Sequence, residues 1–458
     1  MLPPTNADLI QKYNQPVPRY TSYPTVPVWP DLIDLKQWKN EVAEQFNVHN
    51  SHTGMSLYVH LPFCESLCTY CGCNKKITTN HGVEEPYLKA LEKEFALYTR
   101  LFNTKPVIRE LHLGGGTPTF FAPKNLERLM RFLQKHTLFH ADHEFSFEGH
   151  PNNTTQAHLS TLYNLGFRRV SYGVQDTDPE VQRIINRIQP MEKVQQAIEN
   201  ARKTGFASVN FDLIYGLPKQ NLQRLRNTMS DVLALEPDRI AFYSYAHVPW
   251  TSKGQRLFDE NDLPEPAAKL QLYRTGKQIL TEKGYTDIGM DHFALPGEAL
   301  WLARQNGTLH RNFMGYTTRN TALLLGIGVS AISDTGSAFA QNRKSIHEYY
   351  QMLEEDSLPV FKGYFLNEED RSFRNYIHDI SCRGYTEFRK VDAALLSEFT
   401  FPVLQDLAND GLVVWNEREV RVSESGQHFI RNICAAFDLY LQKGKRLQQQ
   451  ITLYSKAI

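Results

Sequence analysis

Between about residue 55 and residue 250, short apolar strands alternate with amphipathic helices, and this alternation constrains the fold more than any other feature. The predicted strands cover residues 56–63, 108–113, 144–148, 169–174, 208–215 and 239–245. The predicted helices cover residues 85–101, 124–135, 155–165, 191–204 and 221–235. Strands that alternate with helices form right-handed βα units around a parallel sheet. Six such units are too few for a closed eight-stranded barrel, so we expect a partial, open α/β barrel of six strands.

Three cysteines follow the first predicted strand on one tight loop. Cys64, Cys68 and Cys71 have the spacing C-x3-C-x2-C. Three thiolates can bind three irons of a four-iron cluster and leave the fourth iron open to a small molecule, whereas a fourth cysteine would close the cluster. His60 and Cys73 lie near enough in sequence to complete a zinc site instead, so the spacing alone leaves both kinds of metal site open.

The other cysteines do not indicate a disulfide framework. The chain has 6 cysteines in 458 residues, and most of them lie in this one loop. Cys382 and Cys434 lie far from the loop in apolar or helical surroundings. We therefore expect these two to be packed thiols rather than metal ligands.

Polar and glycine-rich residues recur where the predicted strands end. Residues 114–119 contain three consecutive glycines, Glu148 ends the third strand, and Asp212 lies inside an otherwise apolar strand. Burial of a carboxylate is unfavourable unless it is paired or binds something. Because ligands of parallel α/β sheets bind beyond the carboxyl ends of the strands, this series predicts a binding site there.

Charge and hydropathy exclude two classes of partner. Lys+Arg 50 balances Asp+Glu 50, so no overall basic field indicates a nucleic-acid partner. No apolar run approaches the ~20 residues that a membrane span requires, and the N-terminus has no signal-peptide pattern. We expect a soluble cytoplasmic protein, in a compartment where thiols stay reduced.

The pattern predicts three regions. Residues 1–40 contain many prolines and form an irregular arm that covers a cleft, residues 41–365 form the catalytic domain, and residues 366–458 form a mostly helical domain. Within the last region, residues 412–415 and 420–422 are typical of a small hairpin close to a winged-helix pattern, and residues 430–447 of a terminal helix.

The cysteine loop resembles the signature of the radical S-adenosylmethionine enzymes, and further blocks narrow the resemblance. They make nearly the whole chain similar to the oxygen-independent coproporphyrinogen III oxidase family. The blocks are residues 18–25, 58–64, 71–75, 114–119, 173–176, 212–218, 289–293, 310–313, 315–318 and 430–434. One departure is visible, since Gly149-His150-Pro151 follows Glu148 where the family form has Val-Asp-Pro. The glutamate itself is present, so we interpret the change as lineage variation.

This resemblance implies a radical S-adenosylmethionine barrel with one [4Fe-4S] cluster held by Cys64, Cys68 and Cys71, and two molecules of S-adenosylmethionine. It further implies a 5′-deoxyadenosyl radical that takes hydrogen from propionate side chains of coproporphyrinogen III. Loss of carbon dioxide and of one further electron then converts two propionates to vinyl groups and gives protoporphyrinogen IX in haem biosynthesis. A cellular electron donor and an electron acceptor are needed, and we expect a monomer. The positions that match cofactor contacts of the family are Tyr58, Tyr70, Gly115, Gly116, Thr117, Glu148, Gln175, Arg187, Asp212, Ala246 and Ile332.

Some residues allow a second interpretation. Tyr58 and Ile332, taken singly, are equally typical of core packing. Arg19 and Arg311 are the candidates for binding the substrate propionates, because guanidinium groups grip carboxylates at two points, and structural ion pairs are the alternative. No catalytic residue is assigned beyond the cluster and the cofactor.

The main alternative function is a haem-handling relative, either a haem chaperone or an enzyme that opens the haem ring. Relatives that handle haem without oxidising coproporphyrinogen have a residue other than cysteine at the position of Cys73. The Cys71-Gly72-Cys73 unit, the proline-rich arm and the full C-terminal region therefore argue against a chaperone. Cys73 is assigned no catalytic step.

Overall fold

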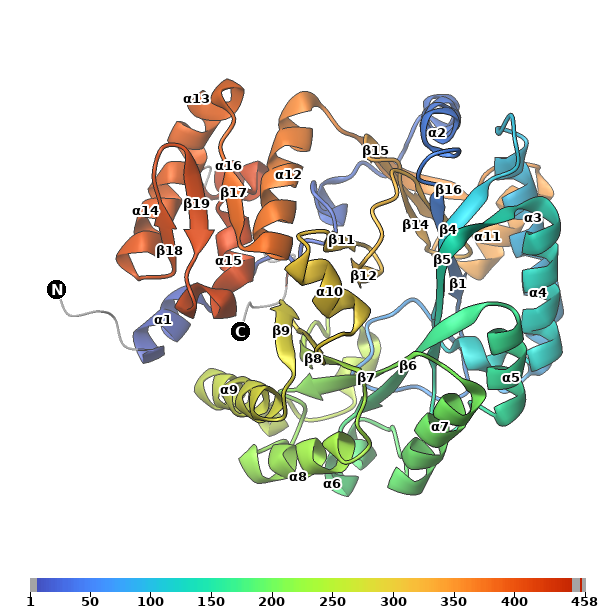
Figure 1. Cartoon of the computed structure of the whole chain (residues 1–458), viewed down its shortest axis with the longest axis horizontal. Helices are drawn as coiled ribbons and strands as arrows, with labels where there is room; N and C mark the ends of the chain where they lie inside the picture. Colours follow the sequence, from blue (N-terminus) through green and yellow to red (C-terminus); the bar gives the residue numbers. More distant parts are fainter. Residues whose placement is uncertain (1–5, 447–453, 455–458) are drawn as a thin grey trace.

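The computed structural model describes residues 6–446 and residue 454, and its centre is a sheet of parallel strands (Figure 1). Six strands lie side by side in chain order, and every neighbouring pair is parallel. These strands are β1 (Met55–Leu61), β4 (Val107–Gly115), β5 (Leu138–Gly149), β6 (Phe167–Gln175), β7 (Ser208–Tyr215) and β8 (Arg239–Ser244). The predicted α/β barrel of six βα units is therefore confirmed.

Helices cover the outer face of this sheet, and Figure 1 shows them as a layer around it. They are α3 (Glu84–Thr99), α4 (Pro123–His136), α5 (Gln156–Asn164), α6 (Pro179–Ile184), α7 (Met191–Thr204), α8 (Leu222–Leu233) and α9 (Pro266–Glu282). In α4 the buried side chains are Leu126, Leu129, Met130 and Leu133. This spacing of three and four residues places one apolar stripe against the strands, which is why the sequence predicted these helices well.

The sheet continues beyond the six predicted strands at both edges. The order of its 12 strands is β16-β15-β14-β13-β1-β4-β5-β6-β7-β8-β10-β9. The added strands are β9 (Thr286–Gly289), β10 (His292–Ala294), β13 (Leu324–Ile327), β14 (Ile332–Asp334), β15 (Ala338–Asn342) and β16 (Val360–Phe365). Only β13 is parallel to its barrel neighbour, β1, and the rest are antiparallel. The two edge strands do not pair with each other, so the barrel is open.

The N-terminal arm is less irregular than its prolines suggest. Its first described element is α1 (Asn6–Tyr13), and α2 (Leu35–His49) starts where the side chain of Asp34 accepts bonds from the backbone amides of Lys36 and Gln37. Between these helices the chain lies against the C-terminal region. Tyr20 Oη donates to Asp438 Oδ2 at 3.0 Å, and Tyr23 Oη accepts from the Leu439 amide at 3.0 Å.

The C-terminal region contains helices and a small antiparallel sheet. Its helices are α12 (Glu368–Arg383), α13 (Ala393–Leu395), α14 (Phe401–Asn409), α15 (Ile430–Ala435) and α16 (Leu439–Arg446). The predicted hairpin is present as β18 (Val413–Trp415) and β19 (Glu419–Val422), and β17 (Tyr385–Glu387) adds a third strand. The predicted helix 430–447 is wrong as one element, because residues 436–438 interrupt it; residue 447 lies outside the described residues.

One continuous hydrophobic cluster joins this region to the barrel, since it includes both Leu111 and Phe373. The division at residue 366 therefore stays a prediction. Among the described helices, none is long and apolar enough to cross a membrane.

Candidate functional site

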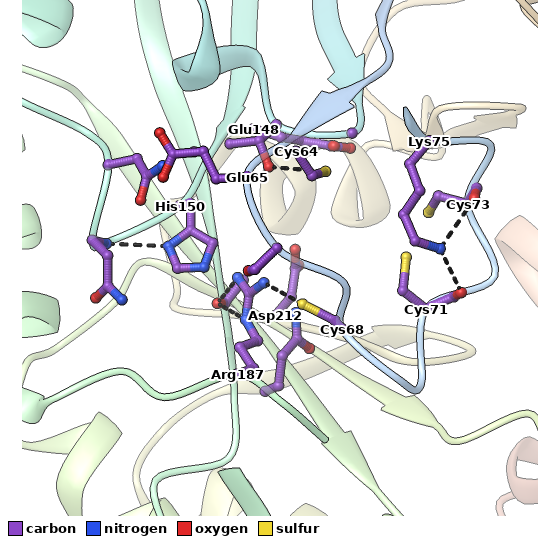
Figure 2. A pocket seen from close by; sticks show the side chains of 18 of the residues that line it. Cys64, Glu65, Cys68, Cys71, Cys73, Lys75, Glu148, His150, Arg187 and Asp212 are labelled. Atoms are coloured by element: carbon purple, nitrogen blue, oxygen red, sulfur yellow. Dashed lines mark hydrogen bonds between the residues drawn. The ribbon is translucent and has the colours of Figure 1, made fainter. Parts of the chain in front are cut away.

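A cavity of about 460 Å³ opens at the carboxyl ends of the barrel strands. Strands β4 to β8 each contribute to its wall, and the cysteine loop forms another side (Figure 2). The strand residues in the wall are Gly115, Glu148, Gly149, Ser171, Gly173, Gln175, Asp212, Ile214 and Tyr243. The binding site that the sequence predicted at the strand ends thus corresponds to a cavity.

The cysteine loop begins at Cys64, the last residue of the short strand β2 (Phe63–Cys64), and returns through β3 (Lys76–Ile77). Two other segments of the chain hold its backbone. The carbonyl of Leu67 accepts from Asn186 Nδ2 at 2.7 Å, and the carbonyl of Tyr70 accepts from Gln255 Nε2 at 2.8 Å. Bonds from both sides fix the loop against the barrel mouth.

Each of the three cysteines with the C-x3-C-x2-C spacing has a polar neighbour. Cys64 Sγ lies 3.3 Å from Thr117 Oγ1, and Arg187 Nη1 donates to Cys68 Sγ at 3.3 Å. A hydrogen bond from Cys73 lowers the pKa of Cys71 to about 6, whereas burial raises the pKa of Cys64 to about 11. Donors beside thiolate sulfurs are what an iron–sulfur cluster requires, because such bonds tune its potential.

The geometry favours a cluster over a single zinc ion. Among the described residues, no three His, Cys, Asp or Glu side chains converge on one ion position. A cubic cluster needs no such convergence, since each cysteine binds a different iron. His60 is engaged at both ring nitrogens, one 3.0 Å from Tyr58 Oη and the other 2.9 Å from the Asn74 carbonyl oxygen. The residues at this site therefore fit a [4Fe-4S] cluster.

The remaining two cysteines lie elsewhere. Cys382 and Cys434 are buried in the C-terminal region, where Cys434 Sγ faces the carbonyl of Ile377 at 3.8 Å. Neither lines the cavity. This agrees with their prediction as packed thiols.

The glycines after β4 are required by close backbone contact. A Cβ on Gly116 would lie 2.6 Å from the carbonyl carbon of Pro62, which belongs to the segment leading into Cys64. Gly115 has a φ of +117°, a conformation that side chains disfavour. Its amide also faces Glu148 Oε2 at 3.3 Å. The two glycines thus hold the cysteine strand close to the cavity wall.

Glu148 and Asp212 are the carboxylates that the strands contribute to the wall, and Glu65 of the cysteine loop is a third. Asp212 accepts from Ser171 Oγ at 3.0 Å and Asn210 Nδ2 at 2.8 Å. Burial and the nearby charge of Glu148 raise the pKa of Asp212 to about 7. Glu148 keeps 45% of its side chain exposed and contacts His112 Nε2 at 3.4 Å. Carboxyl groups that converge on one cavity suit a cationic ligand.

Arg187 connects the cysteine loop to β6. It donates to the Gly173 carbonyl at 2.6 Å as well as to Cys68, and Figure 2 shows its guanidinium pointing at that sulfur. Gln175 has a φ of +69° at the end of the same strand.

Of the residues matched to cofactor contacts, eight line the cavity: Tyr70, Gly115, Gly116, Thr117, Glu148, Gln175, Arg187 and Asp212. Three do not. Tyr58 lies behind the wall beside His60, the carbonyl of Ala246 accepts from Gln255, and Ile332 packs against an aromatic cluster that contains Trp29. Their contact with a cofactor stays a prediction.

The two arginines predicted for the substrate both lie near enough to Tyr243 to influence the pKa of its hydroxyl. Arg19 donates to the carbonyl of Ser244 at 2.7 Å, and its guanidinium lies 6.0 Å from the Tyr243 ring centre. Arg311, in β11 (His310–Asn312), stacks 4.8 Å from the ring centre of Tyr316 and acts electrostatically on Tyr243. Its Nε and Nη1 are buried without a hydrogen-bond partner among the described residues.

Tyr243 and His150 are among the wall residues that sequence reasoning did not single out as site residues. Burial next to Arg187 lowers the pKa of His150 to about 2, so the imidazole is neutral. Its position two residues after Glu148, where the sequence departs from the family form, was a usable signal. Tyr243 is the next-to-last residue of β8, and no feature of the sequence marked it as a site residue.

Comparison with known proteins places these features in one family. The sequence pattern of the Radical SAM superfamily matches residues 58–232. The chain is 41% identical over 447 residues to the oxygen-independent coproporphyrinogen III oxidase of Escherichia coli, covering 96% of both chains. The enzyme of the same name from Pseudomonas aeruginosa is 38% identical, with 95% of this chain and 96% of the relative covered. The solved structure of coproporphyrinogen III oxidase (HemN) from Escherichia coli, titled a radical SAM enzyme, superimposes with a TM-score of 0.88 at 38% identity, covering 96% of this chain and 100% of the other.

Proposed function

Because the chain belongs to the oxygen-independent coproporphyrinogen III oxidase family, we propose that it converts two propionate side chains of coproporphyrinogen III to vinyl groups without oxygen. The product is protoporphyrinogen IX, and each conversion releases carbon dioxide. The observation that carries the proposal is the position of the three cysteines in the wall of the cavity at the strand ends, in a chain related to these enzymes over nearly its whole length.

Cys64, Cys68 and Cys71 would hold the [4Fe-4S] cluster, and Glu148 and Asp212 would hold S-adenosylmethionine, which carries a sulfonium and an ammonium group. When bound, cluster and cofactor supply a radical that removes hydrogen from a propionate. The chain's own residues bind, orient and exclude water, because a radical must be shielded from stray hydrogen donors.

We further propose two molecules of S-adenosylmethionine. An inner chamber of about 110 Å³ shares Glu148, Ser171, Asp212 and Tyr243 with the main cavity. The carboxylates, which come from β5 and β7, thus face both spaces. Anionic groups shared by adjacent spaces support two neighbouring cationic ligands.

Arg19 and Arg311 would bind substrate propionates. They come from distant parts of the sequence, yet the charges of both lower the pKa of the Tyr243 hydroxyl, and Tyr243 lines the cavity and the chamber. The unpartnered N–H groups of Arg311 have the geometry to donate to a carboxylate. A buried guanidinium without its carboxylate is unfavourable, so substrate binding would satisfy it.

An anaerobic assay with S-adenosylmethionine, coproporphyrinogen III, a reductant and an electron acceptor that takes up the electron released with each carbon dioxide tests the function. The expected products are protoporphyrinogen IX and carbon dioxide, and absence of turnover by cluster-loaded protein would contradict the proposal. Arg19→Ala and Arg311→Ala should each lower kcat/KM by about 10- to 150-fold, the equivalent of about 1.5–3 kcal/mol for a charged hydrogen bond. Arg131→Ala, which removes an exposed ion pair with Glu127 on α4, is the control. Equal constants for all variants would refute the substrate placement alone.

A further inference from the structure

A second groove, of about 650 Å³, lies on the other side of the cysteine loop from the cofactor cavity. Its walls are β3, the start of α3, and the segment that leads into α11 (Ile346–Glu354). Asn74 Nδ2 donates to the carbonyl of Lys344 at 3.0 Å and joins two of these walls. The groove is therefore preformed.

The floor of the groove is one strand away from a cluster cysteine. In the parallel pair of β2 and β3, Phe63 is opposite Lys76 and Cys64 is opposite Ile77. Paired strands lie about 4.8 Å apart. Lys75 also donates to the carbonyl of Cys71 at 2.9 Å, as Figure 2 shows. Because electron tunnelling weakens exponentially with distance, a redox centre seated here has a short path to the site of the cluster.

The groove carries excess positive charge in a protein whose total charge is balanced. Its lining includes Lys75, Lys76 and Lys344 and contains no carboxylate. Within the described part of the chain, neither Lys76 nor Lys344 has an ion-pair partner. The nearest carboxylate on α11, that of Glu348, lies 4.0 Å from Arg343.

Apolar side chains lie between these charges. Ile77 is 37% exposed, and Ile346 and Tyr350 also line the groove. A basic rim around apolar contacts is complementary to an acidic protein surface, and such complementarity steers association and fixes orientation.

We propose that this groove is the docking site of an acidic protein that carries a one-electron centre and reduces the cluster. One electron leaves the carrier, which is oxidised by one unit, and enters the cluster, which is reduced by one unit; no bond or proton changes. The inference rests on the proposed function, which requires such a donor and does not say where it binds.

Calorimetric titration with an oxidised flavodoxin, an acidic flavin protein, tests docking without turnover. At low salt, K76E/K344E should bind at least about tenfold more weakly than the wild type, since each substitution reverses a charge facing the partner. The control is K36E/K193E, which makes the same change in net charge on exposed positions of α2 and α7. Wild-type binding should also weaken as salt rises and shortens the screening length. No binding by the wild type, or equal losses in both double variants, would overturn the proposal.

Two further measurements distinguish the loss of the docking surface from the loss of the folded, cluster-loaded protein. All variants should be reduced equally fast by photoreduced deazariboflavin, a small reductant that needs no docking surface. K76E could disturb β3 and lower the iron content. K344E lies outside that strand and should still weaken flavodoxin binding on its own. Unchanged flavodoxin binding by K344E with full iron content would refute the groove as the docking site. Turnover of coproporphyrinogen III with the small reductant tests the proposed function independently.

Discussion

Asp212→Asn should remove a pH dependence from the binding of S-adenosylmethionine. In the free protein, burial and the neighbouring charge of Glu148 raise the pKa of Asp212 from 3.8 to about 7. The carboxyl is therefore about half ionised at neutral pH. Because a cationic ligand favours the ionised form, binding should tighten as the pH rises through this range.

The size of the effect follows from the titration. With a pKa of about 7, the ionised fraction rises from roughly one tenth at about pH 6 to roughly nine tenths at about pH 8. If only the ionised form binds, affinity rises about tenfold, which corresponds to about 1.4 kcal/mol. In Asp212→Asn the amide does not titrate, and this rise should be lost.

Calorimetry of cluster-loaded protein under argon at several pH values measures the change. The amino group of the ligand titrates near pH 7.7–8.0, as α-amino groups do, so the decisive quantity is the difference in slope between wild type and variant. Asp262→Asn, which removes a carboxylate paired with Lys219 at 2.5 Å outside the cavity, is the control. An unchanged slope in Asp212→Asn would refute the reasoning.

The raised pKa of Asp212 also predicts how the stability of the cofactor-free protein changes with pH. Between about pH 4 and pH 7 the folded state binds more protons at Asp212 than the unfolded state, so this group lowers stability as the pH rises. At about pH 8 the Tm of cofactor-free Asp212→Asn should therefore equal or exceed that of the wild type. A clearly lower Tm of the variant would contradict this expectation, because it would mean that the ionised Asp212 carboxylate stabilises the folded protein.

Three further outcomes are expected. Cys68→Ala should lose the cluster while Cys382→Ala keeps full iron content; the opposite pattern in iron analysis would overturn the ligand assignment. Gly116→Ala should lower both iron content and stability, the latter by about 1–3 kcal/mol, because its Cβ meets the Pro62 carbonyl at 2.6 Å; a wild-type melting curve and iron content would contradict this. Glu148→Ala should weaken S-adenosylmethionine binding by about 1–3 kcal/mol, and unchanged affinity by calorimetry would show that the carboxylate faces no ligand.

The barrel could be predicted from the sequence because its signals are local. Strand β7 begins and ends where the apolar run 208–215 predicted, and α7 coincides with the predicted 191–204. Strands β13 to β15 are only three to five residues long. Runs of that length have no distinctive period, and only their neighbours in the sheet define them.

The functional site likewise combines features that are local in the sequence with features that only the fold brings together. The cysteine spacing and the carboxylates at strand ends are visible in the sequence, whereas the proximity of both Arg19 and Arg311 to Tyr243 depends on tertiary structure. The arm and β11 are separated by most of the chain, and no local pattern places them together. For the same reason the groove beside β3 was not foreseen, since Lys76 and Lys344 become neighbours only in the fold.

The contacts of the N-terminal arm affect the order in which the protein matures on the ribosome. Arg19 reaches the carboxyl end of β8, but the bonds that fix the arm join Tyr20 to Asp438 and Tyr23 to Leu439. Chains fold from the N-terminus as they are synthesised, so the cysteine loop and the barrel strands emerge well before the segment that anchors the arm. The arm consequently takes up its contacts with the C-terminal region only after residue 439 has been made.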